Sequence, residues 1–414
     1  MHRDPTAGKC KFLALGRWRG TLMQEDLPCN FFSLSDHLDM LGVTLKATYM
    51  STRKANGDEL QEKIKNVVGP WRAGKFMNLT MRPHSLNCYA FSKLWHRCTS
   101  MDLRAGDIVA INKQAKAWLY ADLLEKPEEL ALYRQPKQGG LGLHHVEQRA
   151  LAHLINSFLE TACNTKFRRN QYHQALFQAY VLEDTTMKPA IPPYFKGNFF
   201  PTIKRIHESP LNVARISLKD IYRFLMDEIT MSEDVSGSMQ LSQLRAELAH
   251  PANDWESAWQ MARQNMLGPS LTTFLFKLLH QILPTAERVS RILPNQSPHC
   301  TRCRENPPAT ETLLHAMFDC QASHAAGVVL LNGLRKFIPN LTPSQVLTLN
   351  FNPSEELSFP LVWITAHFLS SIWQLRADKK RVELIKIRTD MEASCRLLRN
   401  SRLSSTAEVL SQIF

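Results

Sequence analysis

Four potential metal ligands lie within a short stretch of the sequence. Cys300 and Cys303 are separated by two residues, and His315 and Cys320 follow eleven residues later, in a C-x2-C…H-x4-C pattern. Cysteine and histidine are ligands that zinc prefers, and four of them complete a tetrahedral structural site with no position left for water or substrate. The alternative is a chance cluster in a chain with nine cysteines and fifteen histidines. The spacing favours zinc, in a site that holds a shape and does not catalyse.

The same spacing predicts the geometry of this site. His315 and Cys320 are five residues apart, which on a continuous α-helix would separate them by about 140°. We therefore expect Cys320 to lie beyond the end of the helix that carries His315. Three thiolates and a neutral imidazole around Zn²⁺ leave one net negative charge. Arg302 and Arg304 are placed to offset that charge.

The composition favours a folded protein with a polyanionic partner. The chain has 414 residues, of which 44% are hydrophobic, enough for two or three domains with their own cores. Its net charge is +12. Residues 46–118 contain 13 basic and 5 acidic residues, and residues 372–402 contain 9 and 4. This balance favours nucleic acid as the partner, and a basic surface that is simply solvated is the alternative.

The cysteines and the apolar segments bear on the cellular compartment. The nine cysteines are scattered without the spacing of a disulfide framework, which favours a reducing compartment. The first residues lack the apolar stretch of a signal peptide. The longest apolar run, Phe359 to Leu375, is interrupted by polar residues and is short for a membrane span. We therefore expect an intracellular protein of the nucleus, the cytoplasm or both, with no membrane partner.

Strand-like patterns occur only in the first 45 residues, and helical periodicity follows. Two short apolar runs, 12–15 and 41–45, are bounded by glycine and are expected to pair as strands. Apolar residues at helical spacing run from Leu60 to the Gly69-Pro70 pair, where a helix should end. Asp107 is expected to cap a further helix.

Glycines and prolines divide the middle of the chain. The glycine-rich segment 137–143 is expected to be a structural turn, because the Lys-Ser/Thr pair of a phosphate-binding P-loop does not follow the glycines. Residues 185–210 contain five prolines and are expected to form a loop or linker. Helical patterns resume after residue 241, where Ser270 and Thr285 are expected to cap two helices.

The order of these segments resembles the C-terminal part of the reverse transcriptase of LINE-type (non-LTR) retrotransposons, which ends in that family's zinc-binding domain. Each matching segment is short, and their succession makes the resemblance specific over nearly the whole chain. In chain order the segments are Lys9–Trp18, Leu41-Gly42-Val43, Trp71, Gly139–Leu143, Phe276–His280 and Leu283–Arg288, followed by the four candidate zinc ligands. Glu311 lies between the second and the third of these ligands and also matches the family.

The resemblance implies five regions and a mainly α fold. The fold would combine helical thumb-like and connecting domains with a small β element at the N-terminus, and it would end in a zinc-stabilised helical domain. The regions would be a remnant of the palm and primer grip (1–45), a thumb-like region (46–136), a connecting region with the proline-rich loop (137–240), the zinc-binding domain (241–330) and the C-terminal helices (331–414).

The departures from the family indicate a chain without catalysis. In the family, the carboxylates that bind catalytic metal lie upstream of the segment matching Lys9, and this chain has no Asp-Asp pair flanked by apolar residues. The family's endonuclease is also missing. We therefore expect a non-catalytic fragment that grips template RNA and target DNA during target-primed reverse transcription, with no small-molecule substrate. The alternatives are a host-retained zinc-containing protein-interaction module and a truncated part of a full reverse transcriptase.

Binding is expected through contacts with the phosphate backbone, with slight base specificity. The candidate residues are basic side chains of the thumb-like region and of the late helix. They are Lys46, Arg53, Lys63, Lys65, Arg72, Lys75, Lys93, Arg376, Lys379, Lys380, Arg381, Lys386 and Arg388.

The isolated chain should show no polymerase and no nuclease activity with Mg²⁺ or Mn²⁺, because the sequence offers no paired carboxylates to hold two catalytic ions. Primer-extension and nuclease assays on the purified protein check this. Primer extension above background that disappears when a carboxylate of this chain is substituted would contradict the prediction.

Overall fold

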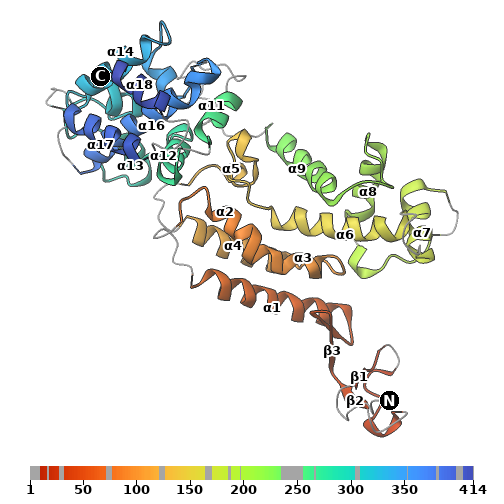
Figure 1. The fold of residues 1–414 in the computed structure, drawn as a ribbon. Coiled ribbons are helices and arrows are strands. Elements are labelled where there is room, and N and C mark those ends of the chain that lie inside the picture. Colours follow the sequence, from red (N-terminus) through yellow and green to blue (C-terminus); the bar gives the residue numbers. More distant parts are fainter. Residues whose placement is uncertain are drawn as a thin grey trace, which may run out of the picture. The chain divides into compact units, whose positions relative to one another are not determined.

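The structure is a computed structural model of the chain, and its fold is mainly α with a small β element near the N-terminus, as expected (Figure 1). The statements below concern the residues that it describes. These are 10–15, 18–27, 32–70, 77–120, 126–163, 170–184, 188–195, 197–234, 255–264, 267–303, 308–351, 353–378, 382–397 and 404–413.

The chain divides into two compact units, each assembled from separate stretches of sequence. The predicted regions 241–330 and 331–414 belong to the same unit, unit 2. Unit 1 comprises residues 1–73, 84–119 and 144–237, and unit 2 comprises residues 74–83, 120–143 and 238–414.

Unit 1 begins with two two-stranded sheets. Strand β1 (Cys10–Leu13) pairs in parallel with β2 (Phe32–Ser35), and β3 (His37–Met40) pairs antiparallel with β4 (Val43–Lys46). The prediction that segments 12–15 and 41–45 pair with each other is therefore wrong. The second segment instead closes a hairpin on its immediate neighbour, since a two-residue turn has a small entropic cost of loop closure.

The hairpin is fixed to the helices of unit 1 by buried polar side chains. Its turn, Leu41-Gly42, has φ values of 51° and 80°, which the tight turns of two-residue hairpins require. Arg97 is buried, donates to the carbonyl oxygen of Gly42 at 2.7 Å and pairs with Glu59 at 2.8 Å. Asn56 is also buried and exchanges hydrogen bonds of 3.0 and 2.7 Å with the backbone of β4.

Helix α1 (Tyr49–Val68) begins at a capping box and ends just before Gly69, as the sequence predicts. The chain continues through α2 (Arg82–Ser85), the π-helical η3 (Leu86–Phe91), α3 (Ser92–Cys98) and α4 (Ala105–Leu119). Asp107 is not the cap of α4, because it lies inside the first turn and its carboxylate accepts the backbone N–H of Arg104 at 3.1 Å. It is buried against Gly57 of α1, which lets the two helices pack closely (Figure 1).

The second half of unit 1 packs around a cluster of phenylalanines. Phe158 meets Phe195, Phe199 and Phe200 with ring centroids 5.1–5.6 Å apart. Aromatic pairs at this separation add to the stability gained by burial. Most of this core comes from α6 (Val146–Ala162), α7 (Gln171–Phe177), α8 (Phe199–Glu208) and α9 (Leu218–Asp234), and Phe195 comes from the short 3-10 helix η6 (Pro193–Phe195).

The prediction that residues 185–210 form a loop is wrong for its second half, which is α8. Phe199, Phe200, Ile203 and Ile206 of this helix are buried. Pro201 is compatible with the helix because it lies in the first turn, where backbone N–H groups have no partner within the helix.

In unit 2 several helices pack against α16 (Glu355–Ala377). This helix keeps the expected apolar character, and Trp363, Ile364 and Phe368 are among its fully buried residues. Among the described residues the α-helices of this unit are α5 (Glu129–Tyr133), α11 (Trp255–Ala262), α12 (Pro269–Leu279), α13 (Ala286–Ile292), α14 (His324–Arg335), α15 (Pro343–Leu347), α16 (Glu355–Ala377), α17 (Leu384–Leu397) and α18 (Ser404–Ile413).

Some of the helix caps and turns predicted for unit 2 are present in the structure. Thr285 caps α13 as expected, whereas Ser270 does not cap α12, because Gly268 holds that position and Pro269 begins the helix. The glycine-rich segment 137–143 is a structural turn, with Gly140 so close to the carbonyl of Arg134 that no side chain would fit. Among the residues that the structure describes, no helix is long and apolar enough to cross a membrane.

The close approach of α1 and α4 gives a test of the fold. Gly57→Ala should destabilise unit 1 by about 1–3 kcal/mol, because its methyl group would overlap the buried carboxylate of Asp107. Gly106→Ala in α4 is the matched control, since a Cβ there meets no atom within 4 Å, and it should stabilise the unit by up to about 1 kcal/mol. Chemical denaturation measures both, and equal effects of the two substitutions would contradict the packing.

Candidate metal centre

A short backbone ladder positions the first two cysteines of the predicted metal site. The N–H of Cys300 donates to the carbonyl oxygen of Ala309 at 2.8 Å, and the N–H of Glu311 donates to that of Pro298 at 2.9 Å. Between them His299 and Thr310 form an isolated antiparallel bridge. This ladder leads directly to Cys300 and Cys303, and its other side leads to the helix that carries His315.

A π-helical turn brings the last two ligands together. His315 begins the π-helical segment η8 (His315–Asp319), and Cys320 follows it with extended backbone at φ −62° and ψ 129°. The N–H of Cys320 donates to the carbonyl oxygen of His315 at 2.8 Å, the i→i+5 bond of a π-turn. The prediction that Cys320 lies past the helix end is confirmed. The wider turn also compensates for the angular separation that a regular α-helix would impose.

The four ligand atoms converge. They lie within 4.8 Å of one another. The Cys320 sulfur is 3.7 Å from that of Cys300 and 3.6 Å from that of Cys303, and the Cys303 sulfur is 3.1 Å from Nε2 of His315. A tetrahedral site with metal–sulfur bonds of about 2.3 Å has edges of about 3.8 Å. The cluster therefore has the size and shape to hold one metal ion, as the spacing predicts.

Burial and backbone hydrogen bonds act in opposite directions on the pKa values of Cys300 and Cys303. Burial raises the pKa of the Cys300 thiol and raises the pKa of Cys303 to about 12. Backbone N–H groups of Arg302, Cys303 and Gln321 reach these two sulfurs and act in the opposite direction. Hydrogen bonds of this kind stabilise thiolates, the form that binds metal. Arg302 is partly buried in the same loop, and Arg304 lies outside the described residues.

Glu311 joins this centre to the helical body of unit 2. Its buried carboxylate accepts the N–H of Ala286, the first residue of α13, at 2.7 Å and forms a bidentate ion pair with Arg376 of α16. Burial would raise the pKa of Glu311, but the hydrogen bonds and charge of Arg376 outweigh this effect and lower it. Arg376 also lies 4.4 Å from the ring centroid of Trp373. No local spacing could reveal this pair, since its members are 65 residues apart.

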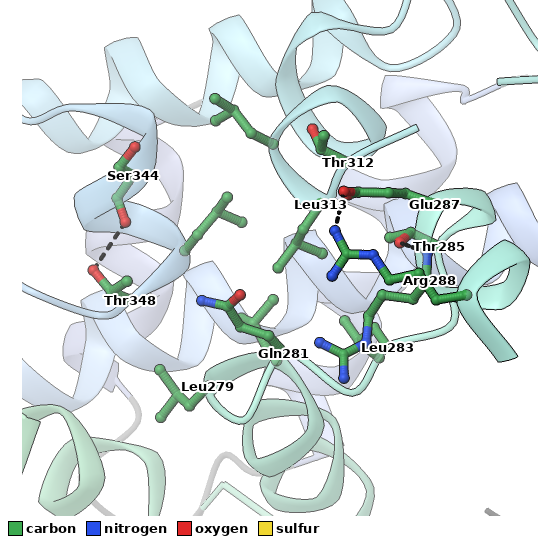
Figure 2. A pocket seen from close by; sticks show the side chains of 14 residues that line it. Leu279, Gln281, Leu283, Thr285, Glu287, Arg288, Thr312, Leu313, Ser344 and Thr348 are labelled. Atoms are coloured by element: carbon green, nitrogen blue, oxygen red, sulfur yellow. Dashed lines mark hydrogen bonds and ion pairs between the residues drawn. The ribbon is translucent and has the colours of Figure 1, made fainter. Parts of the chain in front are cut away.

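A cavity of about 240 Å³ opens where α12, α13 and α15 meet the segment that leads into His315 (Figure 2). Leucines of α12, of α15 and of the segment before His315 form its apolar walls, together with Leu283, and Thr312, Glu287 and Arg288 give it a polar side. Gln281 lines it with a left-handed backbone, φ 55°, at a helix end where glycine is usual. The cavity could take an apolar side chain.

In unit 1, most of the predicted nucleic-acid contacts have acidic partners. Lys93 is exposed in α3 and forms no ion pair with any described residue. Arg72 lies outside the described residues, as does Lys75, which belongs to the stretch 74–83 of unit 2. The paired cations are Lys46 with Asp36 at 3.7 Å, Arg53 with Asp102 at 2.6 Å, Lys63 with Glu59 at 2.6 Å, and Lys65 with Glu62 at 4.0 Å.

In unit 2, the basic residues predicted to contact nucleic acid differ in exposure and in ion pairing. Arg376 is bound to Glu311, and its side chain is only 15% exposed. Arg388 pairs along α17 with Glu392 at 2.8 Å, whereas Lys386 is exposed and forms no ion pair with a described residue. The remaining three, Lys379, Lys380 and Arg381, lie outside the described residues.

Comparison with known proteins gives no assignment. No protein-family model matches the chain, and no curated protein matches it. The resemblance to LINE-type reverse transcriptases therefore rests on the quoted residues and their order alone.

The metal centre predicts a specific response to cysteine substitution. Cys300→Ala should reduce the bound metal from about one ion per chain to almost none and destabilise unit 2 by on the order of several kcal/mol, because the free energy of metal binding contributes to folding. The matched control is Cys395→Ala, which removes a buried cysteine of α17 in the same unit. Elemental analysis and thermal unfolding measure both effects. Retention of the ion by Cys300→Ala would contradict the assignment.

Proposed function

We propose that this chain is a zinc-containing, non-catalytic nucleic-acid-binding protein related to the C-terminal part of a LINE-type reverse transcriptase. The observation that carries the proposal is the convergence of Cys300, Cys303, His315 and Cys320 on one point. These are the positions at which the resemblance places the zinc ligands of that family.

The donor set supports zinc over other cations. Three sulfurs and one imidazole nitrogen suit zinc, whereas magnesium and calcium prefer oxygen ligands. Cys300, His315 and Cys320 are buried, and four protein ligands leave no open position for a reacting group. A closed site of this kind stabilises a fold, which agrees with a chain that binds and does not catalyse.

The net charge of +12 supports a nucleic-acid partner. Exposed lysines such as Lys93 and Lys386 would contact phosphates of the backbone, and zinc would keep the surrounding part of unit 2 rigid. In target-primed reverse transcription such surfaces would hold the template RNA and the target DNA beside a polymerase active site. Contacts of this type carry little base specificity.

A protein-interaction module is the second candidate, and the ion pairs favour it. Among the predicted contacts that the structure describes, six of eight form an ion pair with Asp or Glu. A cation that is already paired gains less from a phosphate, because its acidic partner must be displaced. The leucine-walled cavity near His315 is the kind of feature that such a module would use.

Salt dependence separates the two candidates. The affinity of the wild-type protein for duplex DNA or RNA should fall by about 0.9 log unit per contacted phosphate for each tenfold rise in salt, because counterions are released on binding. Fluorescence anisotropy with labelled oligonucleotides of different sequence measures this slope. Binding that is undetectable at low salt, or insensitive to salt, would contradict nucleic-acid binding and favour the interaction module.

Charge reversal locates the contacts. The triple substitution Lys379→Glu, Lys380→Glu and Arg381→Glu should weaken binding to all sequences equally, because these residues would contact phosphates and not bases. The control with the same change in net charge is Lys113→Glu, Lys137→Glu and Lys219→Glu, three exposed lysines outside the predicted set. Equal losses in the triple variant and the control would show that only net charge matters.

A further inference from the structure

Unit 1 contains a cluster of cationic and aromatic side chains that the metal centre does not involve. His153 of α6 stacks on Trp95 of α3 with ring centroids 5.5 Å apart, and His144 meets the edge of Trp95 at 5.9 Å. The guanidinium of Arg149 lies 5.0 Å from the ring centroid of Tyr222 of α9. Helices α3, α6 and α9 and the residues just before α6 therefore bring two imidazoles and a guanidinium together.

The backbone around this cluster is held firmly. The N–H of His144 donates to Oδ1 of Asn87 at 2.9 Å, and the N–H of His145 donates to the hydroxyl of Tyr222 at 2.9 Å. His144 also meets the edge of the Tyr222 ring at 5.9 Å. The cluster is thus a preorganised part of unit 1 in which the side chains have little freedom to find other partners.

Polar atoms of the cluster lack partners. Nδ1 of His144, Nε of Arg149 and Nε2 of His153 are buried from solvent without a hydrogen bond. No Asp or Glu among the described residues lies within ion-pair distance of Arg149, although most other arginines of unit 1 have such a partner. Arg149 as a whole is only partly buried.

A partly buried guanidinium without an acidic partner has an unfavourable free energy of desolvation, which a bound anion would offset. Withdrawing a charge from water is unfavourable unless an opposite charge or hydrogen bonds compensate. Burial lowers the pKa of Arg149, and burial together with the charge of Arg149 lowers the pKa values of His144 and His153 to about 4. Both imidazoles are therefore neutral at pH 7, and each can donate one hydrogen bond while Arg149 supplies the charge.

We propose that Arg149, His144 and His153 form a binding site for a phosphate group. The guanidinium would bind two phosphate oxygens, because its parallel N–H groups match the geometry of that anion. The imidazoles would donate further hydrogen bonds from the Trp95 side. This inference extends the proposed function, because the phosphate of a nucleic-acid strand is its expected source, and a free phosphate monoester offers the same chemistry.

The experiment uses the full chain, with inorganic phosphate as the first probe and a single-stranded RNA oligonucleotide as the second. Calorimetric titration at constant ionic strength measures phosphate binding, and anisotropy measures RNA binding. Arg149→Gln removes the charge of the site. Arg215→Gln is the matched control, since Arg215 is exposed in the same unit and outside the cluster.

The wild type and the control should bind phosphate saturably, and Arg149→Gln should bind it about tenfold or more weakly. In phosphate-free buffer Arg149→Gln should unfold at the same temperature as the wild type or higher, because an unpaired charge has been removed. A variant that had merely lost a structural contact would unfold at a lower temperature.

The two probes separate the possible failures. Loss of RNA affinity in Arg149→Gln, but not in Arg215→Gln, would identify the strand as the source of the phosphate. Phosphate binding without any RNA binding by the wild type would overturn the proposed function and leave the site intact. Absence of saturable phosphate binding by the wild type, or equal binding by Arg149→Gln, would overturn the site.

Discussion

Unit 2 depends on the buried carboxylate of Glu311, which connects the metal centre to the surrounding helices. On one side Glu311 continues the ladder that positions Cys300, and on the other it binds Arg376 of α16 and the first residue of α13. Removing one partner of a buried ion pair typically costs about 3–5 kcal/mol. The metal ligands are therefore held by a polar connection to the core as well as by the metal that they are arranged to bind.

In unit 1 a buried charged side chain also connects two structural elements, and here it is an arginine. Arg97 is buried and binds both the hairpin turn, at the carbonyl of Gly42, and Glu59 of α1. Arg149 is the contrasting case, because it lies among aromatic rings without a carboxylate partner in the described part of the chain. The proposed phosphate site rests on this difference between the two arginines.

Patterns that depend on local physics could be predicted from the sequence. The mainly α fold, the end of α1 before Gly69 and the convergence of the four metal ligands all follow from short-range spacing. Distant partners could not be predicted in this way. Residues 199–208 looked like a loop because of their prolines, whereas the buried phenylalanines of α8 decide their structure. The ion pair of Glu311 with Arg376 joins residues that only the tertiary fold brings together.

The central claim is that the four converging side chains hold zinc in a closed structural site. X-ray absorption at the zinc edge of the purified chain tests it most directly. The account predicts three sulfur neighbours at about 2.3 Å and one nitrogen neighbour at about 2.0–2.1 Å, with no oxygen ligand. A chain that binds no zinc when folded in its presence, or a spectrum with oxygen neighbours in place of sulfur, would contradict the account.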